Sequence, residues 1–143
     1  MSDNNTLDYY NLHTADFVNT TQNVDFHEIQ ELFLSFLPAK AKLLDFGCGS
    51  GRDTKYFINN GYEVDAMDGS KELCKVATKY TGIKVQHMLF EDFNASNVYD
   101  GIWACASILH IKKCELSDMI TRLYQALKKN GVIYMSFKYG DFE

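Results

Sequence analysis

The stretch Leu44–Arg52, which reads LDFGCGSGR, decides the fold of this chain. The apolar run of residues 42–46 indicates a buried strand that carries one acid, Asp45, close to its end. Glycine at every second position from Gly47 to Gly51 lets the backbone turn sharply and approach a ligand without a Cβ in the way. A strand followed by such a loop and then by a helix predicts a ligand site in an α/β sheet.

Strands and helices continue to alternate after this loop. We expect four further strands and two helices, over residues 62–67, 83–88, 101–106 and 132–137 and over residues 52–60 and 70–80, respectively. A third helix follows the fourth strand of the sheet, with an apolar face from Leu116 to Leu127, and we expect it to end at Asn130-Gly131.

A helix also precedes the first strand. Apolar residues recur at helical spacing from Phe26 to Leu37, and Pro38 ends the pattern. The 143 residues fit one domain, which we divide into an N-terminal helical cap (1–38) and a cofactor-binding α/β core (39–143). Because alternating strands and helices pair through right-handed crossovers, we predict an open, doubly wound α/β sheet, mainly parallel, with helices on both faces.

The composition excludes several classes of protein. Hydrophobic residues make up 46% of the chain, which excludes intrinsic disorder, and the net charge of −5 argues against a nucleic-acid partner. The longest apolar run is about half of what a membrane span needs, so we expect no membrane partner. No signal-peptide pattern is present, which predicts a cytoplasmic protein. We expect no metal site, because no zinc-ligand spacing occurs among the cysteines Cys48, Cys74, Cys105 and Cys114.

The second strand of the predicted sheet ends in another acid, Asp68, 19 residues after Gly49. That distance is close to the spacing at which a carboxylate holds the two hydroxyls of a ribose in nucleotide-binding sheets. Alternatively, Asp68 only caps the helix that begins near Ser70. A dinucleotide fingerprint needs a glycine where this chain has Arg52, so a site for a pyrophosphate is disfavoured.

The chain resembles the class I S-adenosylmethionine-dependent methyltransferases in three places: the loop Leu44–Gly51, Asp68 and the strand Tyr99–Trp103. The resemblance is greatest to small bacterial members grouped with the tellurite-resistance-type methyltransferases, and it runs from about Tyr10 to Glu143. It implies a Rossmann-like methyltransferase fold with the strand order 3-2-1-4-5, and S-adenosylmethionine as the cofactor.

The same resemblance assigns the methionine part of the cofactor to the first loop. Asp45 would orient the methionine amino group, and Gly47, Cys48 and Gly49 would let the methionine portion lie along the loop. The sulfonium carries its own leaving group, so methyl transfer needs no covalent intermediate. Holding an in-line geometry can supply much of the rate enhancement.

The nucleoside part of the cofactor is assigned to the second and third loops. Asp68, with Gly69 beside it, would hold the ribose hydroxyls. After the third strand, either Glu91 or Asp92 would meet the adenine amino group, and Phe93 would pack beside the ring. The choice between the two acids is open.

Three further residues are candidates on the side of the methyl acceptor. Ala106 would line the side that faces the methyl group, as the resemblance implies. His110 is either a general base or substrate contact, or an ordinary loop histidine. Tyr10 is either a lid over the cofactor or an apolar staple of the N-terminal helix. We also expect Trp103 to lie in the core, and Arg52 to pair with an acid or to reach a carboxylate.

These residues predict a methyltransferase that moves a methyl group from S-adenosylmethionine to a small molecule or metalloid anion by in-line displacement. One alternative is a nucleotide-dependent oxidoreductase on the same sheet, which the glycine spacing disfavours. Another is a non-catalytic cofactor-binding module that acts through association with another chain.

The end of the sequence raises a question of assembly. The enzymes that the chain resembles carry two further strands after the fifth, and these C-terminal strands are absent from a sequence that stops at Glu143. Residues 132–137 would then form an apolar edge strand, which is a template for pairing. We therefore expect either a truncated form of a longer enzyme or a homodimer through this edge.

Overall fold

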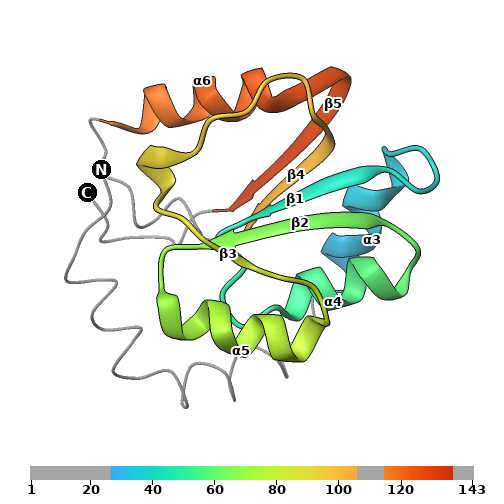
Figure 1. Cartoon of the computed structure of the whole chain (residues 1–143). Coiled ribbons are helices and arrows are strands. Elements are labelled where there is room, and N and C mark those ends of the chain that lie inside the picture. Colours follow the sequence, from blue (N-terminus) through green and yellow to red (C-terminus); the bar gives the residue numbers. More distant parts are fainter. Residues whose placement is uncertain (1–26, 106–114, 137–143) are drawn as a thin grey trace.

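The computed structural model describes residues 27–105 and 115–136, which form one sheet with helices on both faces (Figure 1). The strands are β1 (Lys42–Phe46), β2 (Glu63–Asp68), β3 (Gln86–His87), β4 (Tyr99–Cys105) and β5 (Leu127–Ser136). Their order is β3-β2-β1-β4-β5, and every neighbouring pair is parallel. The predicted doubly wound sheet and its strand order are confirmed. Parallel pairing brings all carboxyl ends of the strands to one edge.

The helices lie on opposite faces of this sheet. They are α3 (His27–Ser35), α4 (Arg52–Asn59), α5 (Lys71–Thr81) and α6 (Leu116–Ala126), together with the short 3₁₀ turn η1 (Phe90–Asp92). In Figure 1, α6 covers one face, and α4 and α5 cover the other. Helix α3 shares the face of α4, because its residue Phe33 packs in one buried cluster with Phe57 of α4.

Alternation along the central strands supplies both faces of the core. Leu43 of β1 belongs to the buried cluster under α3 and α4, whereas the next residue, Leu44, belongs to the cluster under α6. In the same way Trp103 and Ile102 of β4 lie in different clusters. This period of two, in strands that are apolar on both sides, is what a sheet between two helical layers requires.

Strand β3 is shorter than the expected strand over residues 83–88. The N–H of Ile83 donates to the Thr81 hydroxyl (3.3 Å), and the N–H of Val85 donates to the Thr78 hydroxyl (3.0 Å). Both donors are therefore bonded to the end of α5 and not to β2. Pairing with β2 begins only at Gln86.

The expectation that the last helix ends at Asn130-Gly131 is wrong. Helix α6 ends at Ala126, whose carbonyl accepts the N–H of Val98 (2.9 Å), and the chain continues directly as β5 from Leu127. Asn130 has a φ of 69° and lies within β5, where the register against β4 is irregular. A left-handed residue of this kind fits a β-bulge as well as a helix end.

Helix α4 packs closely on α5 at Gly51, which has a φ of 97°. A Cβ at this position would lie 2.7 Å from Cγ2 of Thr81 and 3.3 Å from Cβ of Ala77. The Thr81 side chain is fixed, because its hydroxyl donates to the Ala77 carbonyl (2.7 Å) and accepts the N–H of Ile83. Backbone conformation and packing therefore both require glycine here.

We predict that Gly51→Ala destabilises the fold more than Gly61→Ala does. Gly61 has a φ of 90°, and a Cβ there would meet no heavy atom within 4 Å. Both variants carry the cost of a left-handed alanine, about 1–2 kcal/mol, and Gly51→Ala adds an overlap of about 1–3 kcal/mol. Chemical denaturation measures the two free energies of unfolding. Equal losses would contradict the close contact at Gly51.

Candidate functional site at the carboxyl edge of the sheet

The glycine loop after β1 is bonded to the end of β2. The N–H groups of Gly47 and Cys48 both donate to the Met67 carbonyl (2.9 Å each), and the N–H of Gly49 donates to Oδ2 of Asp68 (2.8 Å). Gly47 and Gly49 have φ values of 79° and 58°, which residues with a side chain rarely adopt. Two predicted cofactor segments, the loop and Asp68, thus lie in direct contact.

Asp68 is the last residue of β2, and only 8% of its surface is exposed. Its Oδ2 accepts the N–H of Gly49, and its Oδ1 accepts the N–H of Ser70 (2.8 Å). The cap of α5 is Ser70, whose hydroxyl accepts the N–H of Leu73 (3.3 Å). Burial raises the pKa of Asp68, against the lowering effect of these two N–H donors. A carboxylate offers about four acceptor positions, so Asp68 can also bind two hydroxyls.

Asp45 lies one residue before the end of β1 and is buried. Its Oδ2 accepts a hydrogen bond from the hydroxyl of Thr54 on α4 (2.6 Å). Burial raises the pKa of Asp45 to about 8, and the neighbouring Asp53 carboxylate adds to that rise. The site therefore holds a buried acid that a bound cation would favour in its ionised form.

Asp53, in the first turn of α4, is a third buried acid and the most heavily bonded of the three. Its carboxylate accepts the Gln30 amide of α3 (2.6 Å), the Trp103 indole N–H of β4 (2.9 Å), and both Nε and Nη2 of Arg52 (3.0 and 2.7 Å). Nη2 of Arg52 also lies 3.8 Å from Sγ of Cys105. Arg52 pairs with an acid, as one of its two expected roles states, and Trp103 is fully buried as expected.

The sequence analysis missed the role of Asp53. An acid in the first turn of a helix is common, because it complements the helix dipole, so its presence at Asp53 does not by itself indicate a functional role. A signal was present in Gln30, which lies three and four residues before the buried Phe33 and Leu34 on the same face of α3. A polar side chain on an apolar helix face needs a buried partner.

The thiols near the loop are neutral. Burial raises the pKa of Cys48 well above its usual range, and it raises the pKa of Cys74 to about 12. Burial also raises the pKa of Cys105. Since the thiolate is the reactive form, these three cysteines are poor nucleophiles, and nucleophilic catalysis by them is disfavoured.

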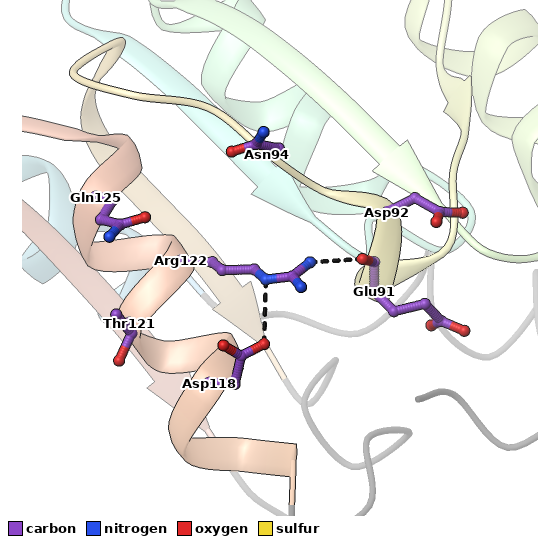
Figure 2. Close-up of a pocket in the computed structure, with 7 residues that line it drawn as sticks. All are labelled: Glu91, Asp92, Asn94, Asp118, Thr121, Arg122 and Gln125. Carbon is purple, nitrogen blue, oxygen red and sulfur yellow. Dashed lines mark hydrogen bonds and ion pairs between the residues drawn. The ribbon is translucent and has the colours of Figure 1, made fainter.

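The two candidate acids for adenine lie on η1. Glu91 is half-buried and Asp92 is exposed, and their side chains point in different directions in Figure 2. Phe93, directly after the turn, is buried and packs against Phe46 at a ring distance of 5.5 Å. The turn thus presents acids outward and anchors itself in the core under α6. Tyr10, Ala106 and His110 lie outside the described residues.

A polar pocket of about 500 Å³ separates η1 from α6 (Figure 2). Its lining residues come from η1, from Asn94 shortly after it, and from α6: Glu91, Asp92, Asn94, Asp118, Thr121, Arg122 and Gln125. Within residues 27–105 and 115–136, no cluster of three or more His, Cys, Asp and Glu side chains could hold a metal ion. No helix in the same part of the chain is long and apolar enough to cross a membrane.

The raised pKa of Asp45 predicts how stability depends on pH. The folded chain keeps this proton up to a pH of about 8, whereas the unfolded chain loses it near the ordinary pKa of 3.8. The contribution of Asp45 to stability therefore falls as the pH rises from about 4 to 8, by up to about 1.4 kcal/mol per pH unit. Asp45→Asn removes this contribution, and denaturation at several pH values measures it.

Glu72→Gln is the matched control for this experiment. Glu72 is exposed on α5 and makes a surface ion pair with Lys75 (3.7 Å). This variant should keep the slope of stability against pH that the wild type shows. A wild-type slope in Asp45→Asn would contradict the raised pKa.

Comparison with known proteins agrees with this geometry. A family model described as a methyltransferase domain matches residues 43–131. The malonyl-[acyl-carrier protein] O-methyltransferase of Enterobacter lignolyticus is 32% identical over 110 residues. That match covers 72% of this chain but 42% of the relative, so the chain spans less than half of that relative's length.

Solved structures show the same fold. A TehB-like SAM-dependent methyltransferase from Corynebacterium glutamicum superposes with a TM-score of 0.71 at 19% identity, over 92% of this chain and 73% of that one. The 1,6-didemethyltoxoflavin-N1-methyltransferase of Burkholderia thailandensis, solved with S-adenosylhomocysteine, gives a TM-score of 0.68 at 23% identity, over 85% and 56%. The family model covers more than half of the sequence, and the expected class I family is confirmed: this chain belongs to the methyltransferase domain family.

Proposed function

We propose that this domain transfers the methyl group of S-adenosylmethionine to a small-molecule acceptor by in-line displacement. The observation that carries the proposal is the glycine loop bonded to Asp68 at the carboxyl ends of β1 and β2. In open α/β sheets, ligands bind just beyond the carboxyl ends of the strands. The proposal also rests on membership in the methyltransferase domain family.

The residues around the loop suit this cofactor. Asp45 orients the methionine amino group, the backbone of Gly47, Cys48 and Gly49 runs along the methionine portion, and Asp68, beside Gly69, holds the ribose. Burial raises the pKa of both Asp45 and Asp68. A cationic ligand replaces part of the solvation that these carboxylates lose, so binding and ionisation favour each other.

The nucleoside and the acceptor contact the remaining candidates. Glu91 or Asp92 on η1 accepts a hydrogen bond from the adenine amino group, and Phe93, which follows the turn, packs beside the adenine ring. S-adenosylmethionine supplies an electrophilic methyl group on a sulfonium, and the protein holds the acceptor in line with it. From the resemblance we further propose that Ala106 lines the side facing the methyl group, that Tyr10 closes over the cofactor, and that His110 contacts the acceptor or takes its proton.

The backbone of the loop argues against the oxidoreductase alternative. A pyrophosphate binds at such a loop through its free N–H groups. Here the N–H groups of Gly47 and Cys48 donate to Met67, that of Gly49 donates to Asp68, and that of Gly51 donates to the Cys48 carbonyl (3.1 Å). These donors are therefore bonded within the protein. Burial raises the pKa of Cys48, and the carboxylates of Asp45 and Asp68 lie close enough to the loop to add to that rise.

Two further observations support a proposal for the methyl acceptor and for the cellular compartment. The resemblance of the chain to small bacterial methyltransferases of the tellurite-resistance type supports a small molecule or a metalloid anion as the acceptor. Cys48, Cys74 and Cys105 are free thiols in the part of the chain that the structure describes, which supports a reducing compartment, the cytoplasm.

We also propose that two chains associate through β5. This strand is the last in the sheet order, and its residues from Val132 to Ser136 are half-buried, so the edge offers both backbone groups and apolar surface. Light scattering at high micromolar concentration, with a cross-link directed at Val132, should detect a dimer. A monomer at every concentration would contradict this association.

The cofactor site is tested by Asp68→Ala. Loss of hydrogen bonds to a charged group should weaken binding of S-adenosylhomocysteine by about 1.5–3 kcal/mol, as titration calorimetry measures. The matched control is Asp65→Ala on the same strand, where the carboxylate accepts the Tyr99 hydroxyl (2.7 Å) away from the loop. It should leave the affinity unchanged. A folded Asp68→Ala variant with wild-type affinity would show that the ribose assignment is wrong.

A further inference from the structure

Arg122 connects α6 to the turn η1 across the polar pocket. Its Nη1 donates to the Glu91 carbonyl (2.5 Å) and lies 3.4 Å from the Phe93 carbonyl, and its Nε pairs with Asp118 (3.1 Å), one turn earlier on α6 (Figure 2). The two carbonyls belong to the residues immediately before and after Asp92. The Arg122 guanidinium therefore bonds the backbone on both sides of Asp92.

The turn η1 is short, and its own backbone supplies few hydrogen bonds to hold it. It follows β3, which pairs with β2 through only two residues. Its own hydrogen bonds are those of a single turn, from the N–H of Asp92 to the Leu89 carbonyl and from the N–H of Phe93 to the Phe90 carbonyl. The last carbonyls of a helical turn have no partner within the turn, and Arg122 supplies donors to two of them.

Beneath the turn, apolar packing anchors it to the core. The rings of Phe90 and Phe93 pack on Phe46 at 4.5 and 5.5 Å. A planar guanidinium with fixed donors adds an orientation at the surface of the turn, where the two acids lie. Asp118 in turn limits the rotation of the Arg122 side chain, which is 35% exposed.

We propose that Arg122 is a positioning residue that orients the turn η1, so that the acid that meets the adenine amino group, Glu91 or Asp92, points toward it, and so makes this domain select adenine over a 6-oxopurine. This inference rests on the proposed function, since it assumes that η1 meets the nucleoside of the cofactor. Arg122 acts through the turn and does not itself touch the ligand. A surface ion pair alone, as Arg122–Asp118 would be, contributes at most about 1 kcal/mol to stability and nothing to base selection.

The experiment compares two ligands by calorimetry: S-adenosylhomocysteine and S-inosylhomocysteine, in which an oxygen replaces the 6-amino group. The wild type should prefer the adenine ligand, because a carboxylate accepts from an amino group and is repelled by a carbonyl oxygen. Arg122→Met should bind the adenine ligand about tenfold more weakly, the scale of one hydrogen bond to a charged group. Its affinity for the inosine ligand should change less than about twofold, so the selectivity collapses.

Arg122→Lys and Lys75→Met complete the design. A lysine keeps the charge beside Asp118 and one donor for the turn, so it should restore part of the selectivity, and it serves the same test if Arg122→Met does not fold. Lys75→Met removes another helical ion pair, with Glu72 on α5, and should leave both affinities unchanged.

Each remaining outcome has a separate meaning. A wild type that binds neither ligand overturns the proposed function itself. A wild type that binds both equally overturns the adenine role of η1, and this inference with it, while cofactor binding stands. If the wild type is selective and Arg122→Met keeps the selectivity, or lowers both affinities equally, Arg122 has only a structural role.

Discussion

The bond between the glycine loop and the end of β2 is the constraint on which the site depends. Two N–H groups of the loop converge on the Met67 carbonyl, and a third reaches the Asp68 carboxylate. These bonds require left-handed backbone at Gly47 and Gly49, which glycine adopts without the cost that a Cβ would impose. They also place the carboxylate of Asp68 against the glycine loop, although 19 residues separate Gly49 from Asp68.

Three buried carboxylates surround this loop, and their partners differ in kind. Asp53 accepts hydrogen bonds from α3, from β4 and from the guanidinium of Arg52, so its charge is compensated within the protein. Asp45 has one hydroxyl partner, and Asp68 has two N–H partners. Burying a charge without a compensating charge is costly. Asp53 therefore links α3, α4 and β4 within the fold. Asp45 and Asp68 gain most from a cationic or hydroxyl-bearing ligand.

The two faces of the sheet contribute differently to the carboxyl edge. Helices α3, α4 and α5 lie on one face, which includes Asp53 of α4. Helix α6 lies on the other face and reaches the edge through Arg122, which bonds the turn η1. The methionine and adenine ends of the proposed cofactor site are thus supported by different helical layers.

Much of the fold could be read from local pattern. Runs of apolar residues ending in glycine or acid located β1, β2 and β4, and alternation with amphipathic segments determined that they pair in parallel. The misjudged boundaries, those of β3 and of the junction between α6 and β5, depend on where single N–H groups find acceptors. The N–H of Val85 donates to the Thr78 hydroxyl instead of pairing with β2. The N–H of Val98 donates to the carbonyl of Ala126, the last residue of α6. Neither choice changes the local apolar pattern.

The sequence by itself determined the sheet, the loop and the acids at its carboxyl edge, because burial and strand direction are encoded in residues close together in the chain. Only the tertiary structure decided the partners of the buried polar groups. Gln30 and Trp103 meet Asp53 from 23 and 50 residues away, and Arg122 meets the carbonyl of Glu91 from 31 residues away. Such pairs form where helices and strands cross, and a buried donor or acceptor must find its partner there whatever the separation along the chain.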